Sequence, residues 1–505
     1  MNFTLLPWSV QIDYPILAAL QLLPLLSVAV ALAWNGRRYL FWIGLGAALL
    51  ELLLALDLYR SYDLGIHAMQ FEERQPLLGA LEYHAAADGL TVLFVLLNAL
   101  LTTMVIIYSE ARRLQPLSLL LAIVFLIEAT LMSLLVSLNL FWFLLMSAIQ
   151  LLPVGYLMWR WSVSPDRDLA LARFLQFMGV SLALLLGGTL MLGLNHLDAT
   201  GRWSFDLLDL TAVKVPVETH SVVFFLVFYG LALRTPLFPF HGWLPIIAEH
   251  GSIAVAPVFL LGLKTGIYGL LRFVFPLLPE AVLQWHRYVV AFALAGVFYA
   301  ALMALLQVNL RRLFAFAVVS HTSLIVIGLF TLGEYAIEGS VLLSVNFGLA
   351  ITGLIFMIGL IYRRTGSVLL SRLGGLFDTL PLFGITFLVA GLSIIGMPGT
   401  PGFDAVHLVM EDSIRRFGAL IAITAALGNV VAAGFLLLAF QRAFLSRDAT
   451  DGDTEQVEPA TTLEKLVSAM VILLLLGCGF YLEPWLRLVD GSARSLSLLF
   501  YSGSG

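Results

Sequence analysis

The sequence predicts an all-α polytopic membrane protein with about fourteen transmembrane helices. Hydrophobic residues make up 60% of the 505 residues and charged residues 12%, whereas a typical soluble protein is about 25% charged. Apolar runs of about 17 to 25 residues, long enough to cross a bilayer as helices, follow one another along the chain. The net charge of −5 is spread thinly, which argues against a nucleic-acid-binding surface and a polybasic membrane anchor.

The expected spans are predominantly apolar, and more polar segments separate them. They cover residues 14–34, 39–58, 89–108, 116–136, 138–159, 171–193, 220–235, 252–276, 286–307, 311–332, 339–362, 379–412, 417–440 and 463–484. The twelfth contains GMPGTPGF at 396–403, where prolines and glycines remove backbone donors and helix propensity. We expect a broken helix there. Such breaks survive at membrane depth where protein or water satisfies the freed backbone groups, and transporters place them at binding sites.

Lysine and arginine residues predict the orientation. Loops after odd-numbered spans hold fifteen of them, whereas loops after even-numbered spans and the C-terminal tail hold ten. The positive-inside rule therefore places the odd-numbered loops in the cytoplasm and both termini outside it. The acidic segment 446–465 is expected to be a solvated cytoplasmic loop. The N-terminus lacks the basic region of a signal peptide.

Ionisable side chains inside the predicted spans are the candidate functional residues, because a charge at the bilayer centre costs about 2.5 to 3.5 kcal/mol on insertion scales. They are Glu128, Arg234, Lys264, His321, Asp404, His407 and Glu411. Lys264 is one of three lysines in the chain, and a buried lysine can release and rebind a proton under physiological conditions. The alternative is a structural ion pair between Lys264 and Glu128 or another carboxylate.

The other candidates have distinct expected roles. Arg234 does not give up its proton, so it is expected to act as a fixed counter-charge. Glu128 is either the partner of such a charge or a proton shuttle in its own right. His321 has an ordinary pKa near 6.5 and is suited to relaying protons; the alternative is a histidine hydrogen-bonded within the helix bundle.

Asp404, His407 and Glu411 follow the break in the twelfth span at a spacing that places them on one helical face. They are expected to line a half-channel; the alternative is that this half-helix ends at the interface and exposes them to water. Asp404 and His407 lack a third ligand for a metal site. With a single cysteine, Cys478, and no phosphate-binding or nucleophile motif, the chain is expected to hold no cofactor, metal or redox centre of its own.

Several segments resemble signatures of the antiporter-like membrane subunits of respiratory complex I. They are DGLTVLFVLL (88–97), FPFHGWLP (238–245), LKTGIYGLLRF (263–273), QVNLRRLFAFAVVSHTSLIVIGLF (307–330), RLGGL (372–376) and MPGTPGF (397–403). Among those subunits the chain is similar to subunit M, because its eighth-span lysine is followed by T-G-x-Y-G. The superfamily also includes Mrp-type sodium–proton antiporters, membrane-bound hydrogenases and complexes for inorganic carbon uptake.

The resemblance implies two inverted five-helix repeats with broken helices 7 and 12. It divides the chain into helices 1–3 (residues 1–110), a first repeat of helices 4–8 (111–276), a second of helices 9–13 (277–440), and the acidic loop with helix 14 (441–505). It also implies a bacterial inner-membrane location, partner membrane and peripheral subunits, and protons or Na⁺ as the transported ion.

Some positions depart from the family pattern. Lys264 and His321 match, whereas Arg234 replaces a lysine. Ala148 stands where the family carries a glutamate, and Phe347 stands where subunit M has a histidine. The twelfth-span acid would fall at Val406, between Asp404 and His407.

These features predict an ion-translocating, energy-coupling membrane subunit of a complex related to NADH-quinone oxidoreductase. A coupling subunit of an inorganic carbon uptake complex or of a membrane-bound hydrogenase is an alternative within the same superfamily. A non-conducting structural subunit and a stand-alone carrier are alternatives of different classes.

Overall fold

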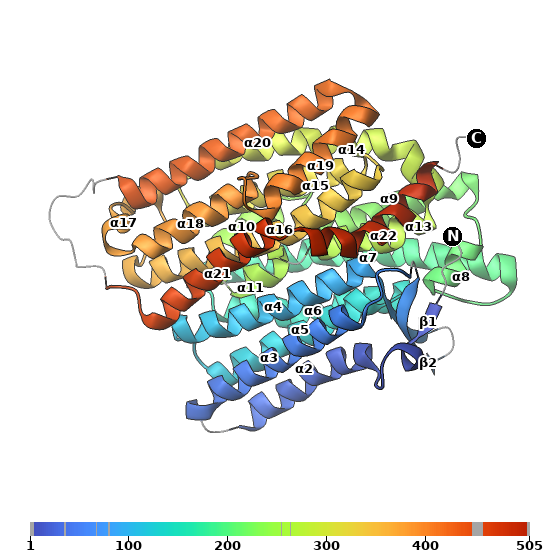
Figure 1. Ribbon diagram of the computed structural model, residues 1–505, viewed down its shortest axis with the longest axis horizontal. Helices are drawn as coiled ribbons and strands as arrows, with labels where there is room; N and C mark the ends of the chain where they lie inside the picture. Colours follow the sequence, from blue (N-terminus) through green and yellow to red (C-terminus); the bar gives the residue numbers. More distant parts are fainter. Residues whose placement is uncertain are drawn as a thin grey trace.

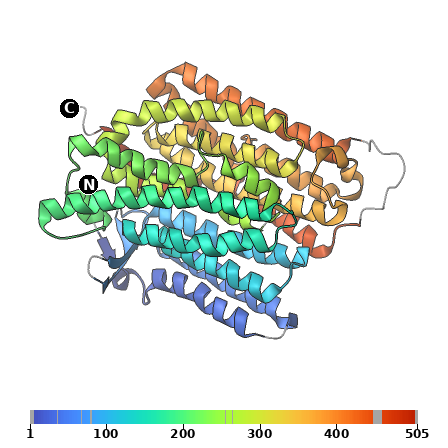
Figure 2. The same cartoon turned by 180° about the vertical axis from the view of Figure 1, so that it is seen from behind.

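The computed structural model describes residues 5–34, 37–66, 68–78, 81–253, 255–262, 264–446 and 458–501. Most of the predicted acidic loop therefore lies outside the described residues. The molecule is a bundle of helices packed side by side (Figures 1 and 2). Within the described residues, 13 helices are long and apolar enough to cross a membrane, and Pro381–Ile394 is a shorter apolar helix. The prediction of a mostly helical, multi-span membrane protein is confirmed.

The long helices reproduce the predicted spans with shifted ends. They are α2 (Ile16–Ala33), α3 (Arg37–Ser61), α4 (Gly89–Arg112), α5 (Leu117–Val136), α6 (Leu140–Arg160), α7 (Arg167–Thr200), α9 (Val217–Arg234), α14 (Pro279–Leu305), α15 (Leu310–Leu329), α16 (Glu334–Thr365), α20 (Ala419–Phe440) and α21 (Thr462–Phe480). Helix α22 (Glu483–Tyr501) follows the fourteenth predicted span and was not predicted. Short elements join them: α1 (Trp8–Gln11), α8 (Leu207–Ala212), α10 (Trp243–His250), η3 (Leu370–Arg372), α17 (Leu376–Thr379) and η4 (Gln441–Leu445).

The eighth span is a chain of short helical pieces. They are α11 (Val255–Pro257), the π-helical η1 (Val258–Gly262), α12 (Thr265–Gly269), the π-helical η2 (Leu270–Val274) and α13 (Phe275–Leu277). π-helical turns are rare and frequently mark functional sites. The interruption lies at Lys264, which has a non-helical ψ of 62°.

The twelfth span is divided as predicted. Helix α18 (Pro381–Ile394) ends before GMPGT, and α19 (Pro401–Phe417) resumes with Pro401 at its first turn. The freed carbonyls have protein donors: Asn346 Nδ2 donates to the Ser393 oxygen at 3.0 Å, and Asn429 Nδ2 donates to the Ile395 oxygen at 2.7 Å. This is how irregular backbone is tolerated at membrane depth. At the seventh span, α9 likewise ends at Arg234, before the proline-rich segment. The inverted repeats and the domain boundaries stay predictions.

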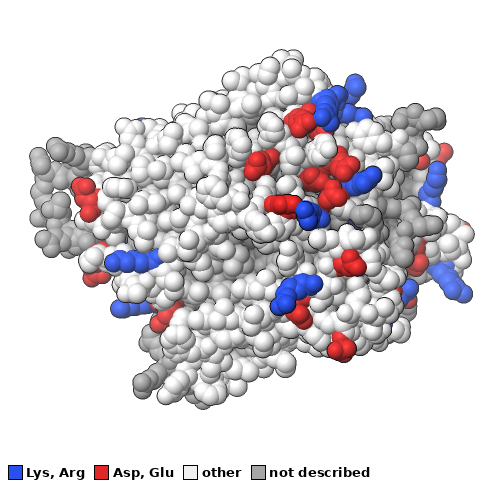
Figure 3. Space-filling model, viewed as in Figure 1, with Lys and Arg blue, Asp and Glu red and all other residues white. Residues whose placement is uncertain are grey.

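Burial separates inner from outer helices. In α15 and α16, 94% of the most apolar stretch of the helix is buried inside the protein, whereas in α3 and α21 the buried share is 28%. A helix that is apolar all round is expected in the interior of a large membrane protein, whereas the outer helices expose leucine and valine side chains such as Leu53 and Leu473. On the face shown in Figure 3, a broad surface without charged side chains separates two groups of charges.

A small sheet lies at the end of the bundle where the N-terminal segment begins (Figure 1). Strands β2 (Met69–Leu78) and β3 (Leu81–Ala87) pair antiparallel, and β1 (Leu5–Pro7) pairs parallel to β2. The sequence analysis did not predict this hairpin. Glu73 in β2 accepts hydrogen bonds from the backbone nitrogens of Leu17 and Ala18, both at 2.9 Å, and so caps α2. Burial raises the pKa of Glu73 to about 7, although these two hydrogen bonds act in the opposite direction.

Candidate functional site

Lys264 lies buried at the interruption of the eighth span. Its side chain is 4% exposed, and its Nζ donates to Thr322 Oγ1 in α15 at 2.7 Å. The same Nζ lies 4.3 Å from the centre of the Phe347 ring in α16, a distance typical of a cation–π contact. Among the described residues no carboxylate forms an ion pair with Lys264, and the Glu128 oxygens have no hydrogen-bond partner. The ion-pair alternative with Glu128 is therefore wrong.

Two glycines allow the interrupted eighth span, which carries Lys264, to pack closely against neighbouring helices. A Cβ on Gly266, the glycine of the T-G-x-Y-G motif, would lie 1.8 Å from Thr235 Oγ1 at the end of α9. A Cβ on Gly348 would lie 2.4 Å from the carbonyl oxygen of Gly262. Both positions need a residue without a side chain, because the backbones approach so closely. Gly266 of the motif thus packs the interrupted eighth span against the end of α9, and the approach of Gly262 and Gly348 packs it against α16.

His321 contacts the same phenylalanine. Its ring stacks on Phe347 with centroids 4.6 Å apart and an interplanar angle of 15°. His321 Nε2 is buried and has no hydrogen-bond partner among the described residues. A cavity of about 10 Å³, lined by His321, Ile394 and Asn429 among others, is about the size of one water molecule. The cavity connects His321 with the break in the twelfth span.

Arg234 lies against α6 beside the position where the family acid is missing. Its Nη2 donates to the carbonyl oxygen of Ser147 at 3.4 Å and to Gln150 Oε1 at 3.3 Å. These two residues flank Ala148. Arg234 Nη1 has no partner in the described part of the chain. Among the described residues, the hydrogen-bond partners of the guanidinium are therefore neutral oxygens, at the place where the resemblance implies a glutamate.

Asp404, His407 and Glu411 share the outer face of α19. Asp404 and His407 are exposed, and Glu411 accepts a hydrogen bond from Arg415 at 2.6 Å in a surface ion pair. The three side chains thus lie on one face of the helix, as their spacing predicts. In this single chain that face points out of the bundle, so the expected half-channel stays a prediction.

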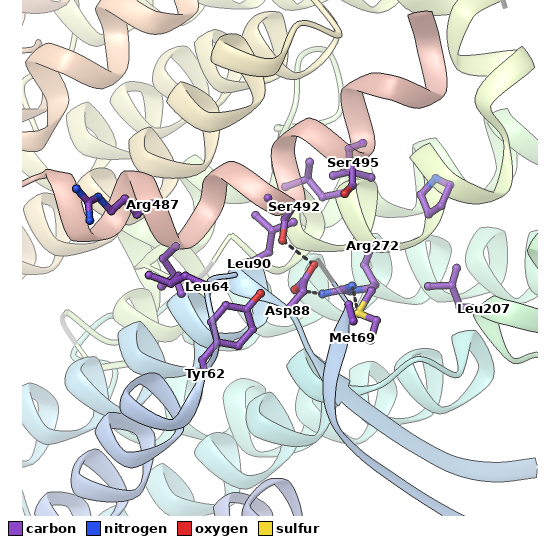
Figure 4. A pocket seen from close by; sticks show the side chains of 16 residues that line it. Tyr62, Leu64, Met69, Asp88, Leu90, Leu207, Arg272, Arg487, Ser492 and Ser495 are labelled. Atoms are coloured by element: carbon purple, nitrogen blue, oxygen red, sulfur yellow. Dashed lines mark hydrogen bonds and ion pairs between the residues drawn. The ribbon is translucent and has the colours of Figure 1, made fainter. Parts of the chain in front are cut away.

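An ion pair that the sequence analysis missed joins the third and eighth spans. Arg272 is 4% exposed and donates through Nη2 to Asp88 Oδ1 at 2.5 Å and to Thr91 Oγ1 at 2.7 Å. Asp88 caps α4 by accepting from the Thr91 nitrogen at 2.9 Å, and it accepts from Ser492 Oγ in α22 at 3.1 Å. Figure 4 shows the side chains of Asp88, Arg272 and Ser492 converging at a cavity, which has a volume of about 110 Å³.

The electrostatics of Asp88 follow from these contacts. Burial alone opposes its ionisation, but the charge and hydrogen bond of Arg272 hold the pKa of Asp88 below its ordinary value. The available signal was an arginine eight residues after Lys264 in the same apolar run. Arg272 is not among the candidates predicted from the sequence, because it lies near the predicted end of the span.

Three further acids gather where α22 meets α16. The ligand oxygens of Glu334, Glu338 and Asp490 lie within 4.8 Å of one another. Acidic groups of this kind are common without a bound ion, and the sequence analysis expected no metal site. The group places a carboxylate of α22 beside two carboxylates of α16.

With this geometry established, the chain was compared with known proteins. Residues 137–441 match the family model described as NADH:quinone oxidoreductase/Mrp antiporter, transmembrane. The chain belongs to this family. It is 26% identical over 502 residues to NADH-quinone oxidoreductase subunit M of Rickettsia prowazekii (strain Madrid E), covering 97% of this chain and 100% of the relative. The resemblance inferred from the sequence motifs is confirmed.

Solved structures of the antiporter family have the same fold. A chain of respiratory complex I from Thermus thermophilus with bound NADH is 26% identical, with a TM-score of 0.86 over 96% of this chain and 99% of that one. A chain of the Mrp complex from Dietzia sp. DQ12-45-1b is 19% identical, with a TM-score of 0.83 over 96% and 97%. At that lower identity the likeness concerns the fold alone.

Two positions of the polar core lack the groups that the family resemblance implies. The apolar Phe347 ring contacts both Lys264 and His321, where the family resemblance led us to expect a second histidine. In α6, Gln150 accepts a hydrogen bond from Arg234, beside the position where the resemblance implies a glutamate. Lys264 and Arg234 are thus held by hydroxyl, amide and aromatic groups.

Proposed function

We propose that this chain is an ion-translocating, energy-coupling membrane subunit of a multisubunit complex related to NADH-quinone oxidoreductase. The observation that carries the proposal is Lys264, a buried amine without a carboxylate partner among the described residues, at an interruption of a transmembrane helix. A charge in this position is expensive, and such residues typically mark ion pathways. Family membership and the relatives' names support the same reading.

The proposed pathway runs across the bundle through groups on different helices. Arg234 is the fixed charge at one end, and Lys264 and His321 are the groups that take up and release protons. The cavity beside His321 leads to the break between α18 and α19, where Asn429 donates to a freed carbonyl. Because Phe347 offers no donor or acceptor, a proton passing from Lys264 to His321 must move around its ring through water.

The exposed ionisable side chains of α19 support the presence of a partner subunit. Asp404 and His407 lie on the outside of an otherwise apolar bundle, and charged groups facing lipid are costly. A neighbouring membrane subunit that covers α19 removes this cost and extends the pathway through Asp404, His407 and Glu411. We place the complex in the bacterial inner membrane with both termini of this chain outside the cytoplasm, and we propose protons or Na⁺ as the ion.

Ion uptake into vesicles that hold the assembled complex tests the proposal. Lys264→Ala should abolish uptake, and Lys264→Arg should do so too, because arginine keeps the charge but does not release its proton. Lys465→Ala is the matched control, since this lysine is exposed near the start of α21. If Lys264→Ala leaves uptake unchanged while the complex is intact, the proposal is wrong.

A second candidate is a structural subunit that does not conduct. The observation that favours it is the Phe347 ring, which occupies the place where the resemblance led us to expect a histidine and contacts both protonatable groups. The same vesicles separate the two candidates. A wild-type complex whose uptake equals that of a complex with Lys264→Ala supports the structural role.

A further inference from the structure

A pair of buried carboxylates lies among the first spans and does not interact with Lys264. Glu51 in α3 is 1% exposed and Glu128 in α5 is 0% exposed. The two side chains interact electrostatically with each other, and no such interaction reaches Lys264. In the part of the chain that the structure describes, none of the four carboxylate oxygens has a hydrogen-bond partner. Two buried acids therefore interact with each other, and among the described residues no cation forms an ion pair with either of them.

Helix α4 adds further oxygens to the pair. Asn98 Nδ2 donates to the backbone oxygen of Glu128 at 3.5 Å, while its Oδ1 is buried and has no partner among the residues that the structure describes. The Thr102 hydroxyl interacts with the Glu128 carboxylate without reaching hydrogen-bond geometry. Both residues are 0% exposed, and their spacing of four places them on one face of α4. Thr103 Oγ1 in α4 donates to the backbone oxygen of Ala48 at 3.4 Å. Because Ala48 lies about one turn before Glu51 in α3, this hydrogen bond ties α4 to α3 near the pair.

The charge of this group requires a ligand. Two adjacent carboxylates cannot both stay ionised in a low-dielectric site, and each unpaired ion costs several kcal/mol to bury. The unpartnered side-chain atoms of Glu51, Glu128, Asn98 and Thr102 are all oxygens, the ligand type that hard cations prefer. A proton on one carboxyl also supplies the donor that the group lacks. Mg²⁺ is a poor match, because it usually keeps several of its waters.

We propose that Glu51 and Glu128, together with Asn98 and Thr102, form a binding site for small monovalent cations, H⁺ or Na⁺. The bound cations neutralise the pair within the first spans, before the segment 137–441 that matches the family model. The site is separate from the pathway through Lys264 and does not depend on that pathway being active. Its occupancy is an equilibrium property and is measurable without an ion gradient.

Infrared difference spectroscopy of the purified complex tests the site through the carbonyl stretch of protonated carboxyl groups. At neutral pH in buffer without Na⁺, the wild type should show a protonated-carboxyl band that is lost in the double variant Glu51→Gln/Glu128→Gln. Glutamine has the shape of glutamic acid and no charge, so the variant keeps the packing. Glu110→Gln, at the half-buried end of α4, is the matched control and should leave the band unchanged.

Adding NaCl, with choline chloride as the control, distinguishes the two cations. If Na⁺ binds, the band decreases and about one proton per bound ion appears in solution; if the site is specific for protons, the band persists. The single variants Glu51→Gln and Glu128→Gln are measured as well, and each should lose part of the band. They serve as the test if the double variant does not assemble. A band and a Na⁺ binding curve that are the same in wild type and in the glutamine variants overturn the proposal. Loss of uptake in Lys264→Ala with an unchanged band leaves this site standing, so the two proposals fail separately.

Discussion

Replacing Asp88 by asparagine should destabilise the protein strongly, because it leaves the Arg272 guanidinium buried without a counter-charge. The pair is close, at 2.5 Å, and Arg272 is 4% exposed. Removing one partner of a buried pair typically costs about 3 to 5 kcal/mol. Asparagine remains a good N-cap, so the cap of α4 is kept and the change isolates the charge. A loss of about 3 kcal/mol corresponds to roughly a 150-fold change in the unfolding equilibrium.

Reversible unfolding of the purified chain in mixed micelles of SDS and a mild detergent measures this loss. Arg272→Met and the double variant complete a cycle, and the double variant should be more stable than Asp88→Asn alone because it holds no unpaired charge. Asp378→Asn, at an exposed position of α17, should change the free energy of unfolding by less than about 0.5 kcal/mol. If Asp88→Asn costs less than about 1 kcal/mol, or the cycle shows no coupling with Arg272, the reasoning about this pair is refuted.

Three further predictions follow from the packing and the polar contacts. Because burial raises the pKa of Glu73 to about 7, above its ordinary value, the free energy of unfolding should fall as pH rises from about 4.5 through 7. Glu73→Gln should flatten this pH dependence in an unfolding series. Gly266→Ala should cost about 1 to 3 kcal/mol because its Cβ meets a hydroxyl at 1.8 Å, whereas Gly46→Ala, with nothing within 4 Å, should be neutral or stabilising in the same assay. Asn346→Leu leaves the Ser393 carbonyl at the helix break without its donor and should lower the free energy of unfolding by about 1 to 3 kcal/mol. An unchanged unfolding curve would contradict this role of Asn346.

Much of the fold was predictable because the bilayer restricts what a chain can do. Composition and run length determined the membrane class and the spans. GMPGTPGF determined the break between α18 and α19, since closely spaced prolines and glycines disfavour a continuous helix. The hairpin of β2 and β3 was not predicted, because its ten- and seven-residue strands carry charged residues and no clear alternation of polar and apolar residues.

Within the candidate site, the sequence by itself determined which residues are unusual: a lysine and acids in apolar runs, and an arginine without its expected acid. Only the tertiary structure decided which of them meet. It places Lys264 against Thr322 and Phe347, sets Glu128 beside Glu51 instead, and pairs Arg272 with Asp88, 184 residues apart. The physical reason is that lipid and protein interior are both apolar. The hydrophobic pattern of a transmembrane helix therefore does not reveal which face turns inward, and close packing of the helices decides the partners of each buried charge.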